Sequence, residues 1–237
     1  MKKQISVLAC AGALSGHALA IEVIGSEWKG EGEFGYVATS GNTETSNLKA
    51  RLGLVHERDK WRHDAKLEAL NTSDRDVTTG ERYAAIWQTD YKFTEFDYSF
   101  GRIHYETDKF SGYDYRVSET VGYGRRVLRR PDMTLDLEAG PGARQSKLET
   151  GAVEKELMLR LAGKYAWDIT AQSRFTQDLS FDIGEDTTIT KSVTAVQAMI
   201  IGDLSMKLSY TLENVSNVPA GVKNTDSETA ATLVYAF

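Results

Sequence analysis

The strongest constraint on the fold of this chain is a period-two alternation of apolar and polar residues. It recurs in runs of about 9 to 13 residues that are separated by short polar breaks. In 204–213, Leu204, Met206 and Leu208 alternate with polar residues such as Lys207. Because successive side chains of a strand point to opposite faces, each run predicts a strand with one apolar and one charged face. Twelve strands are expected, at 28–39, 47–56, 61–70, 81–92, 97–106, 114–127, 133–144, 154–166, 170–181, 189–200, 204–213 and 227–237.

The breaks between these runs are alternately long and short along the whole chain. Long breaks include "SGNTETS" and "NTSDRDVTTG", and short breaks include "ERDK" and "WDIT". An antiparallel meander with two different ends produces this order, and bacterial outer-membrane barrels combine short periplasmic turns with longer external loops. The sequence therefore predicts an all-β fold: a closed antiparallel transmembrane β-barrel of about 12 strands in up-and-down order, with both chain ends on the periplasmic side.

Composition alone favours a soluble protein, because the mean hydropathy is −0.39 and no internal stretch reaches the roughly 20 apolar residues of a membrane helix. A membrane barrel escapes this test, since only alternate residues of its strands face lipid. The aromatic residues favour the barrel, because they form two groups, as two membrane interfaces select. Beside the short breaks or chain ends lie Trp28, Trp61, Phe93, Tyr98, Tyr165, Trp167 and Phe237; toward the long breaks lie Tyr36, Tyr83, Tyr115 and Phe181. Trp87 fits neither group, and a soluble secreted β-sandwich that binds a ligand is an alternative with the same alternation.

The first twenty residues, "MKKQISVLACAGALSGHALA", have the features of a secretory signal: two early lysines, a short apolar core and a small-x-small ending. We expect cleavage after Ala20, a signal peptide at 1–20 and a barrel at 21–237. Cys10 is the one cysteine of the sequence, so the mature chain is expected to have no disulfide; a lipoprotein modified at Cys10 is the alternative. Loss of two lysines moves the formal charge from −6 to about −8, which argues against nucleic acid as a partner.

The last strand ends on a bare aromatic residue, in "SETAATLVYAF". Lipid offers no partner to an unpaired strand edge, so this strand is expected to close the barrel against the first one. Leu233, Tyr235 and Phe237 would then face outward. The ending also resembles the terminal signal of bacterial outer-membrane proteins, which implies recognition by the barrel-assembly machinery through these three residues.

Three segments carry a resemblance to one family: "WKGEGEFGYVATSGNTETSNL", "YDYRVSETVGYGRRV" and the terminal "LVYAF". In these segments the chain resembles the salt-induced outer-membrane proteins, a family whose function is uncharacterised, and the resemblance covers nearly all of the mature chain. It implies an outer-membrane barrel linked to salt or osmotic response. It implies no catalytic residue.

The charged face of the predicted strands is the main candidate for function. Twelve strands lie between the side-chain-filled interior of 8 and the open channel of 16. Both charge signs are present, so this face either closes the lumen with cross-strand ion pairs or lines a narrow wet pore. The candidate pore-lining residues are Lys49, Arg51, Arg62, Asp64, Lys66, Glu68, Asp136, Glu138, Arg160, Lys164, Lys207 and Glu213.

Glycines and a proline are expected to shape the lumen. Gly122, Gly124, Gly140 and Gly142 face inward by the same alternation, and we expect them to leave room there. Pro141 cannot donate a backbone hydrogen bond, so it predicts a bulge or a local distortion of the ladder.

The histidines give weak evidence for chemistry. His56 and His63 flank the "ERDK" break and are expected to face each other on the outward face, where zinc binding would need a third ligand. His104 lies in 97–106, whose faces, like those of 189–200, the pattern does not assign. No order of Ser, His and Asp predicts a triad, so no catalytic residue, cofactor or metal is expected, and a hydrolase acting on lipid or peptide at the barrel wall or rim is the alternative.

Taken together, the pattern predicts a monomeric barrel of the bacterial outer membrane that serves as a small passive pore or an envelope-stabilising protein. Its expected partners are outer-membrane lipid, lipopolysaccharide and the barrel-assembly machinery. Acidic residues in the predicted loops either bind divalent cations or lipopolysaccharide or form a solvated surface; they are Asp74, Asp76, Asp108, Asp114, Glu185 and Asp186.

Overall fold

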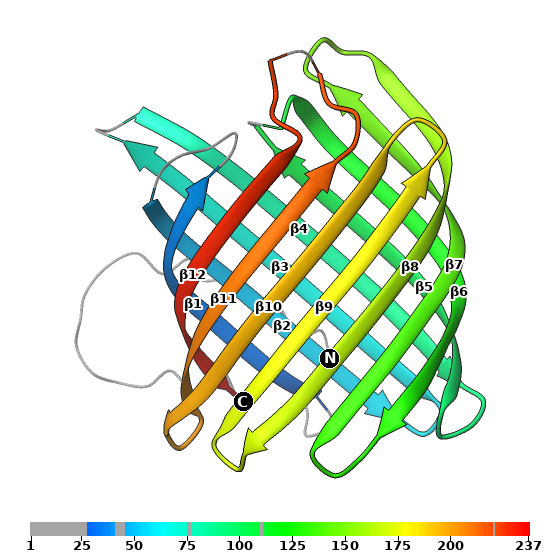
Figure 1. Cartoon of the computed structure of the whole chain (residues 1–237), viewed down its shortest axis with the longest axis vertical. Helices are drawn as coiled ribbons and strands as arrows, with labels where there is room; N and C mark the ends of the chain where they lie inside the picture. Colours follow the sequence, from blue (N-terminus) through cyan, green and yellow to red (C-terminus); the bar gives the residue numbers. More distant parts are fainter. Residues whose placement is uncertain (1–27, 41–45, 75–76, 110, 220) are drawn as a thin grey trace, which may run out of the picture.

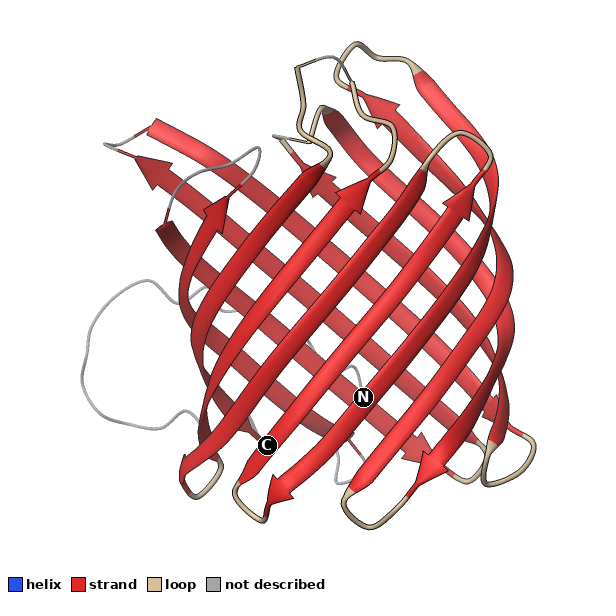
Figure 2. Ribbon diagram, viewed as in Figure 1, coloured by secondary structure: helices blue, strands red, loops and turns tan. Residues whose placement is uncertain are grey.

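Twelve antiparallel strands close into one barrel in which each strand pairs with its sequence neighbours and β1 pairs with β12 (Figures 1 and 2). The computed structural model describes residues 28–40, 46–74, 77–109, 111–219 and 221–237. The strands are β1 (Trp28–Ser40), β2 (Ser46–Arg58), β3 (Trp61–Asp74), β4 (Val77–Lys92), β5 (Asp97–Asp108), β6 (Tyr113–Arg129), β7 (Met133–Leu148), β8 (Val153–Thr170), β9 (Ser173–Gly184), β10 (Thr188–Ile201), β11 (Leu204–Val215) and β12 (Thr225–Ala236). The predicted twelve-stranded meander is confirmed, and its closure shows that the β-sandwich alternative is wrong.

Two parts of the prediction lie outside the described residues: the signal segment at 1–20 with cleavage after Ala20, and the acidic residue Asp76. Within the described residues, no helix has the length and apolar character needed to cross a membrane.

The two ends of the barrel differ less than the breaks in the sequence predict. At the end that carries Trp28 and Ala236, called here the short-turn end, the connections span 59–60, 93–96, 130–132, 171–172 and 202–203. At the opposite, long-loop end, the strands run on into polar sequence, so the predicted break at 71–80 shrinks to 75–76. Polar side chains mark where the apolar band ends, whereas a ladder continues as long as its backbone groups find partners. For the same reason "WDIT" belongs to β8 and is not a turn.

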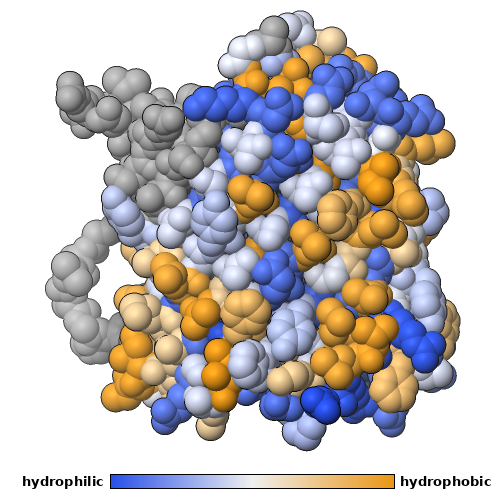
Figure 3. All heavy atoms as spheres, viewed as in Figure 1, coloured by the Kyte–Doolittle hydropathy of each residue, from blue (hydrophilic) through white to orange (hydrophobic). Residues whose placement is uncertain are grey.

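The outward face of the barrel is apolar, as the alternation predicts. Phe34, Leu67 and Leu208 are each more than half exposed, although a soluble protein would bury such residues. In the view of Figure 3, hydrophobic residues gather over the middle and lower parts of the barrel, and hydrophilic residues gather along the upper rim, at the long-loop end. Such a face suits a lipid environment.

The expectation that the inward glycines leave room in the lumen is wrong. In the β5–β6 ladder, Gly124 pairs with Tyr98 and Gly122 with Phe100. Both rings point inward and are only 4% exposed, and a Cβ atom at Gly124 would overlap the Tyr98 ring. The glycines therefore make room for aromatic rings and not for solute. Tyr98 is accordingly not part of an outward aromatic group, contrary to the prediction.

The other two glycines allow close backbone approach. A Cβ atom at Gly140 or Gly142 would overlap backbone carbonyl oxygens of the neighbouring strand β6. Around Pro141 the β6–β7 pairing is interrupted between the pairs Thr120–Gly142 and Tyr123–Ala139, without a change of register. The distortion expected at Pro141 is therefore a gap in the ladder and not a bulge, because proline has no N–H to donate.

Candidate functional site

The barrel interior holds a cavity of about 180 Å³, enough for several water molecules or a small organic ion. It is lined by side chains from strands all around the barrel, and among the described residues eleven lysines and arginines but only six carboxylates line it. The cations are Lys49, Arg51, Lys66, Arg82, Arg102, Arg116, Arg144, Arg160, Lys164, Lys191 and Lys207; the carboxylates are Glu33, Glu68, Glu106, Asp178, Asp182 and Glu213. The cavity wall thus has an excess of positive charge.

Ion pairs cross the lumen toward the long-loop end. Arg116 in β6 pairs with Glu106 in the adjacent strand β5 (Nη2–Oε1, 2.6 Å) and with Glu213 in β11 (3.1 Å). Because β6 and β11 lie nearly opposite each other in the ring of strands, the second contact spans the lumen. Lys191 in β10 reaches the other oxygen of Glu213 at 3.0 Å.

A second crossing contact lies at the same level. Arg82 in β4 pairs with Glu228 in β12 (Nη2–Oε2, 2.6 Å), four strands away around the ring. Lys49 in β2 binds the other oxygen of Glu228 at 2.5 Å. These pairs form what we call the long-loop network: Lys49, Arg82, Glu106, Arg116, Lys191, Glu213 and Glu228.

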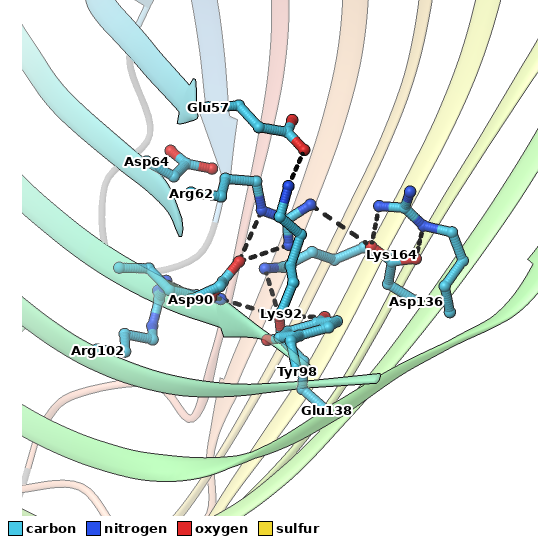
Figure 4. Close-up of polar contacts among 12 residues, drawn as sticks. Glu57, Arg62, Asp64, Asp90, Lys92, Tyr98, Arg102, Asp136, Glu138 and Lys164 are labelled. Atoms are coloured by element: carbon cyan, nitrogen blue, oxygen red, sulfur yellow. Dashed lines mark hydrogen bonds and ion pairs between the residues drawn. The ribbon is translucent and has the colours of Figure 1, made fainter. Parts of the chain in front are cut away.

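A second set of polar contacts lies toward the short-turn end and centres on Glu138, which is 3% exposed (Figure 4). Its Oε1 accepts hydrogen bonds from Gln88 (2.9 Å), Tyr98 (3.0 Å) and Lys164 (2.9 Å). These donors come from β4, β5 and β8, so one carboxylate in β7 joins four strands. A buried carboxylate needs such compensation, because an unpaired charge in a dry interior is costly.

Two arginines extend this set around Asp136 and Asp90. Arg62 pairs with Asp90 at 2.6 Å and lies 3.9 Å from Asp136, while Arg126 binds Asp136 at 2.7 Å (Figure 4). The Arg62 guanidinium also sits 5.3 Å from the centre of the Tyr98 ring, within cation–π range. We call these residues the short-turn network: Arg62, Gln88, Asp90, Tyr98, Arg126, Asp136, Glu138 and Lys164. The cavity is lined by most members of the long-loop network, by Lys164 of the short-turn network and by other side chains of the interior wall.

The structure places all twelve candidate pore-lining residues on the interior wall. Eight line the cavity: Lys49, Arg51, Lys66, Glu68, Arg160, Lys164, Lys207 and Glu213. Arg62, Asp136 and Glu138 belong to the short-turn network, and Asp64 lies 3.4 Å from Lys66. Their contribution to passage of a solute stays a prediction.

The sequence pattern missed the interior residues of β5 and β10. Arg102, His104 and Glu106 of β5 and Lys191 of β10 line the cavity. β5 also turns two aromatic rings inward, and β10 turns Thr194 outward, where it hydrogen-bonds Gln177. The polarity of the faces is thus partly inverted in both strands. The glycines of β6 were the available signal, because a glycine often faces a ring in the neighbouring strand.

The three described histidines lie on both faces of the barrel wall. His56 and His63 pair across the β2–β3 hairpin with ring centroids 5.9 Å apart, as predicted, and stack among Trp28 and Trp61 on the outward face. His104 lies in the lumen, 3.8 Å from Glu106. Among the residues with described positions, no three His, Cys, Asp or Glu side chains gather in a metal-binding group.

Of the acidic residues predicted in loops, Asp114 forms an ion pair with Lys147 at 2.7 Å. Both residues lie in strands near the long-loop end, and each side chain is more than a third exposed. This pair is an ordinary solvated contact of low energy. Binding of divalent cations or lipopolysaccharide by the acidic set stays a prediction.

Sequence comparison gives a family and a relative. The family model described as "Protein of unknown function, DUF481" matches residues 32–237. The chain is 34% identical over 204 residues to "Uncharacterized protein YdiY" of Escherichia coli (strain K12), which covers 86% of this chain and 81% of that protein.

Structural comparison finds barrels of the same kind. The barrel is similar to a NanC porin (TM-score 0.57, 12% identity, covering 88% of this chain and 98% of that chain). It is similar to a KdgM porin in complex with disordered oligogalacturonate (TM-score 0.50, 12% identity, 87% and 99%). It is also similar to the translocator domain of the autotransporter NalP from Neisseria meningitidis (TM-score 0.53, 11% identity, 91% and 90%). At these identities the likeness shows a shared porin-like barrel fold.

Proposed function

We propose that this chain, which belongs to the DUF481 family and closes into a porin-like barrel, is a passive pore of the bacterial outer membrane that favours small anions. This proposal is carried by the composition of the cavity wall, which holds eleven cationic side chains and only six carboxylates. A narrow passage lined by an excess of one charge attracts ions of the opposite sign and repels ions of its own.

The dimensions favour small solutes. A cavity of about 180 Å³ between two networks of ion pairs accommodates a hydrated inorganic ion or a small organic acid, and not a folded chain. The contacts that cross the lumen, such as Arg116–Glu213, narrow it further. The passage is therefore expected to have a small conductance.

The membrane location rests on solvation. Large apolar side chains are exposed around the outside, and ionised side chains are enclosed within. Lipid around the barrel removes the cost of exposing these apolar side chains. Closure of the barrel leaves no unpaired strand edge in the lipid. The short-turn end then faces the periplasm, and outer-membrane lipid and lipopolysaccharide are the contacts of the outward face.

Planar-bilayer recording of the purified full chain in potassium chloride tests the proposal. Discrete steps of small conductance are expected, with a reversal potential in a salt gradient that indicates preference for chloride. Heat-modifiable migration on a denaturing gel verifies that the recorded sample is folded. A folded sample that gives no steps contradicts the pore, and steps that prefer potassium contradict its preference for anions.

The link to salt or osmotic response implied by the sequence resemblance stays a prediction. Growth of a deletion strain at raised sodium chloride concentration tests it directly. A hydrolase acting at the wall or rim stays the alternative; within the described part of the chain no three His, Cys, Asp or Glu side chains form a metal-binding group that would support a metal-dependent one.

A further inference from the structure

Arg102 differs from the other arginines of the cavity wall in how it is held. Its Nη1 donates a hydrogen bond to Gln88 Oε1 at 3.4 Å. The amide nitrogen of Gln88 is used on the other side, where it donates to Asp90 (3.0 Å) and to Glu138 (2.9 Å). Gln88 is 3% exposed, so its carbonyl oxygen is held toward Arg102.

Arg102 is thus oriented by a neutral amide, whereas neighbouring arginines are neutralised by carboxylates. Arg116 and Arg160 lie 2.6 Å and 2.7 Å from Glu106 and Asp182. Within the described ranges, no carboxylate lies within ion-pairing distance of Arg102, and its side chain lines the cavity. A hydrogen bond to an amide fixes a guanidinium without cancelling its charge, and four of its five N–H donors remain.

We propose that Arg102 is the anion-binding residue of the cavity and that its ligand is a small oxyanion, a carboxylate or a phosphate. This proposal rests on the proposed pore and deepens it by naming a residue and a solute class. The planar guanidinium matches the two oxygens of a carboxylate or phosphate, and its weak hydration lowers the cost of contact. The excess of cations around the same cavity adds an attractive field.

The first experiment compares selectivity in planar bilayers under a potassium chloride gradient. Arg102→Gln is expected to lower the anion-to-cation permeability ratio at least threefold. The matched control is Arg125→Gln, because Arg125 lies in the next strand, β6, with its side chain 58% exposed and paired with Asp97 near the short-turn end. The proposal is overturned if Arg102→Gln keeps the wild-type permeability ratio, or if Arg125→Gln lowers that ratio as much as Arg102→Gln does.

The second experiment measures binding without conductance. Line broadening of ¹³C-acetate and of ³¹P-phosphate signals is recorded with the folded barrel in detergent. Wild type is expected to broaden at least one signal, which identifies the oxyanion, and Arg102→Gln is expected to abolish this broadening. Arg102→Lys keeps the charge and loses the planar fork, so it is expected to retain chloride preference and to lose most of the broadening.

The two experiments separate the proposals. A wild-type barrel that broadens the oxyanion signals but gives no conductance contradicts the pore and leaves the anion site supported. A conducting barrel that broadens neither signal, or that broadens them equally in both Arg102 variants, overturns the anion site and leaves the pore intact. Should Arg102→Gln fail to fold, the Arg102→Lys variant alone decides.

Discussion

At the scale of single residues, the bore of the lumen depends on which residues face glycines. The β5–β6 ladder sets Tyr98 and Phe100 beside Gly124 and Gly122, and both rings are buried there. The hydroxyl of Tyr98 then reaches Glu138 at 3.0 Å and joins the short-turn network. Gly124 in β6 thereby makes room for a hydrogen bond between β5 and β7.

Gly124→Ala is predicted to destabilise the barrel by roughly 1–3 kcal/mol, the usual cost of overpacking, because the new Cβ atom would overlap the Tyr98 ring. Urea unfolding in detergent measures the free energy of unfolding. Gly101→Ala is the control, since a Cβ atom there would meet nothing within 4 Å. In a Tyr98→Ala background the effect of Gly124→Ala should largely vanish; an undiminished effect in that background contradicts the explanation.

At the scale of elements, the seam between β1 and β12 decides whether the barrel closes. The backbone N–H of Phe237 donates to Gly30 at 2.9 Å, and the N–H of Gly30 donates back at 2.7 Å. The Phe237 ring covers Gly30, and Leu233, Tyr235 and Phe237 are all exposed on the outward face. Their role as an assembly signal stays a prediction.

Phe237→Ala is predicted to reduce the fraction of chains that reach the folded, heat-modifiable form in cells. The substitution keeps both backbone bonds of the seam and removes the ring over Gly30. Phe237→Tyr retains the ring and should assemble like the wild type. Normal assembly of the alanine variant would show that the terminal ring serves neither the seam nor recognition.

The elements also show how far the sequence predicts the fold. Twelve strands and most of their faces follow from period-two alternation, which is set by the solvents on the two sides of the wall. The strand ends at 71–80 do not follow, because a polar stretch can stay in the ladder. The faces of β5 and β10 do not follow either, since Tyr98 turns inward beside a glycine and Thr194 turns outward to pair with Gln177. Such contacts are visible only once the strands are in register.

At the scale of the whole molecule, the net charge of the chain misleads about its interior. The sequence has 28 lysines and arginines against 34 acidic residues, yet the cavity wall holds eleven cations and six carboxylates. Several acids pair with wall cations from outside the cavity lining, as Glu228 does with Arg82. Composition therefore predicts an acidic protein, and only the fold reveals that cations outnumber carboxylates on the cavity wall.

If the proposed pore conducts, Glu213→Gln is predicted to raise its preference for anions, the opposite of the effect expected for Arg102→Gln. The substitution removes the carboxylate that Arg116 and Lys191 share, and so it leaves more uncompensated positive charge on the wall. Reversal potentials in a potassium chloride gradient measure the change. A shift toward cations would contradict the assignment of selectivity to wall charge.

The central claim is a lipid-facing exterior around a water-filled lumen, and cysteine labelling tests it most directly, because the one native cysteine is Cys10, within the predicted signal. Ser118 and Val121 lie three residues apart in β6; the first lines the cavity and the second is 65% exposed on the outward face. A membrane-impermeant, water-soluble thiol reagent applied to proteoliposomes is predicted to label Ser118→Cys and to spare Val121→Cys. Labelling of Val121→Cys with none of Ser118→Cys would contradict the account.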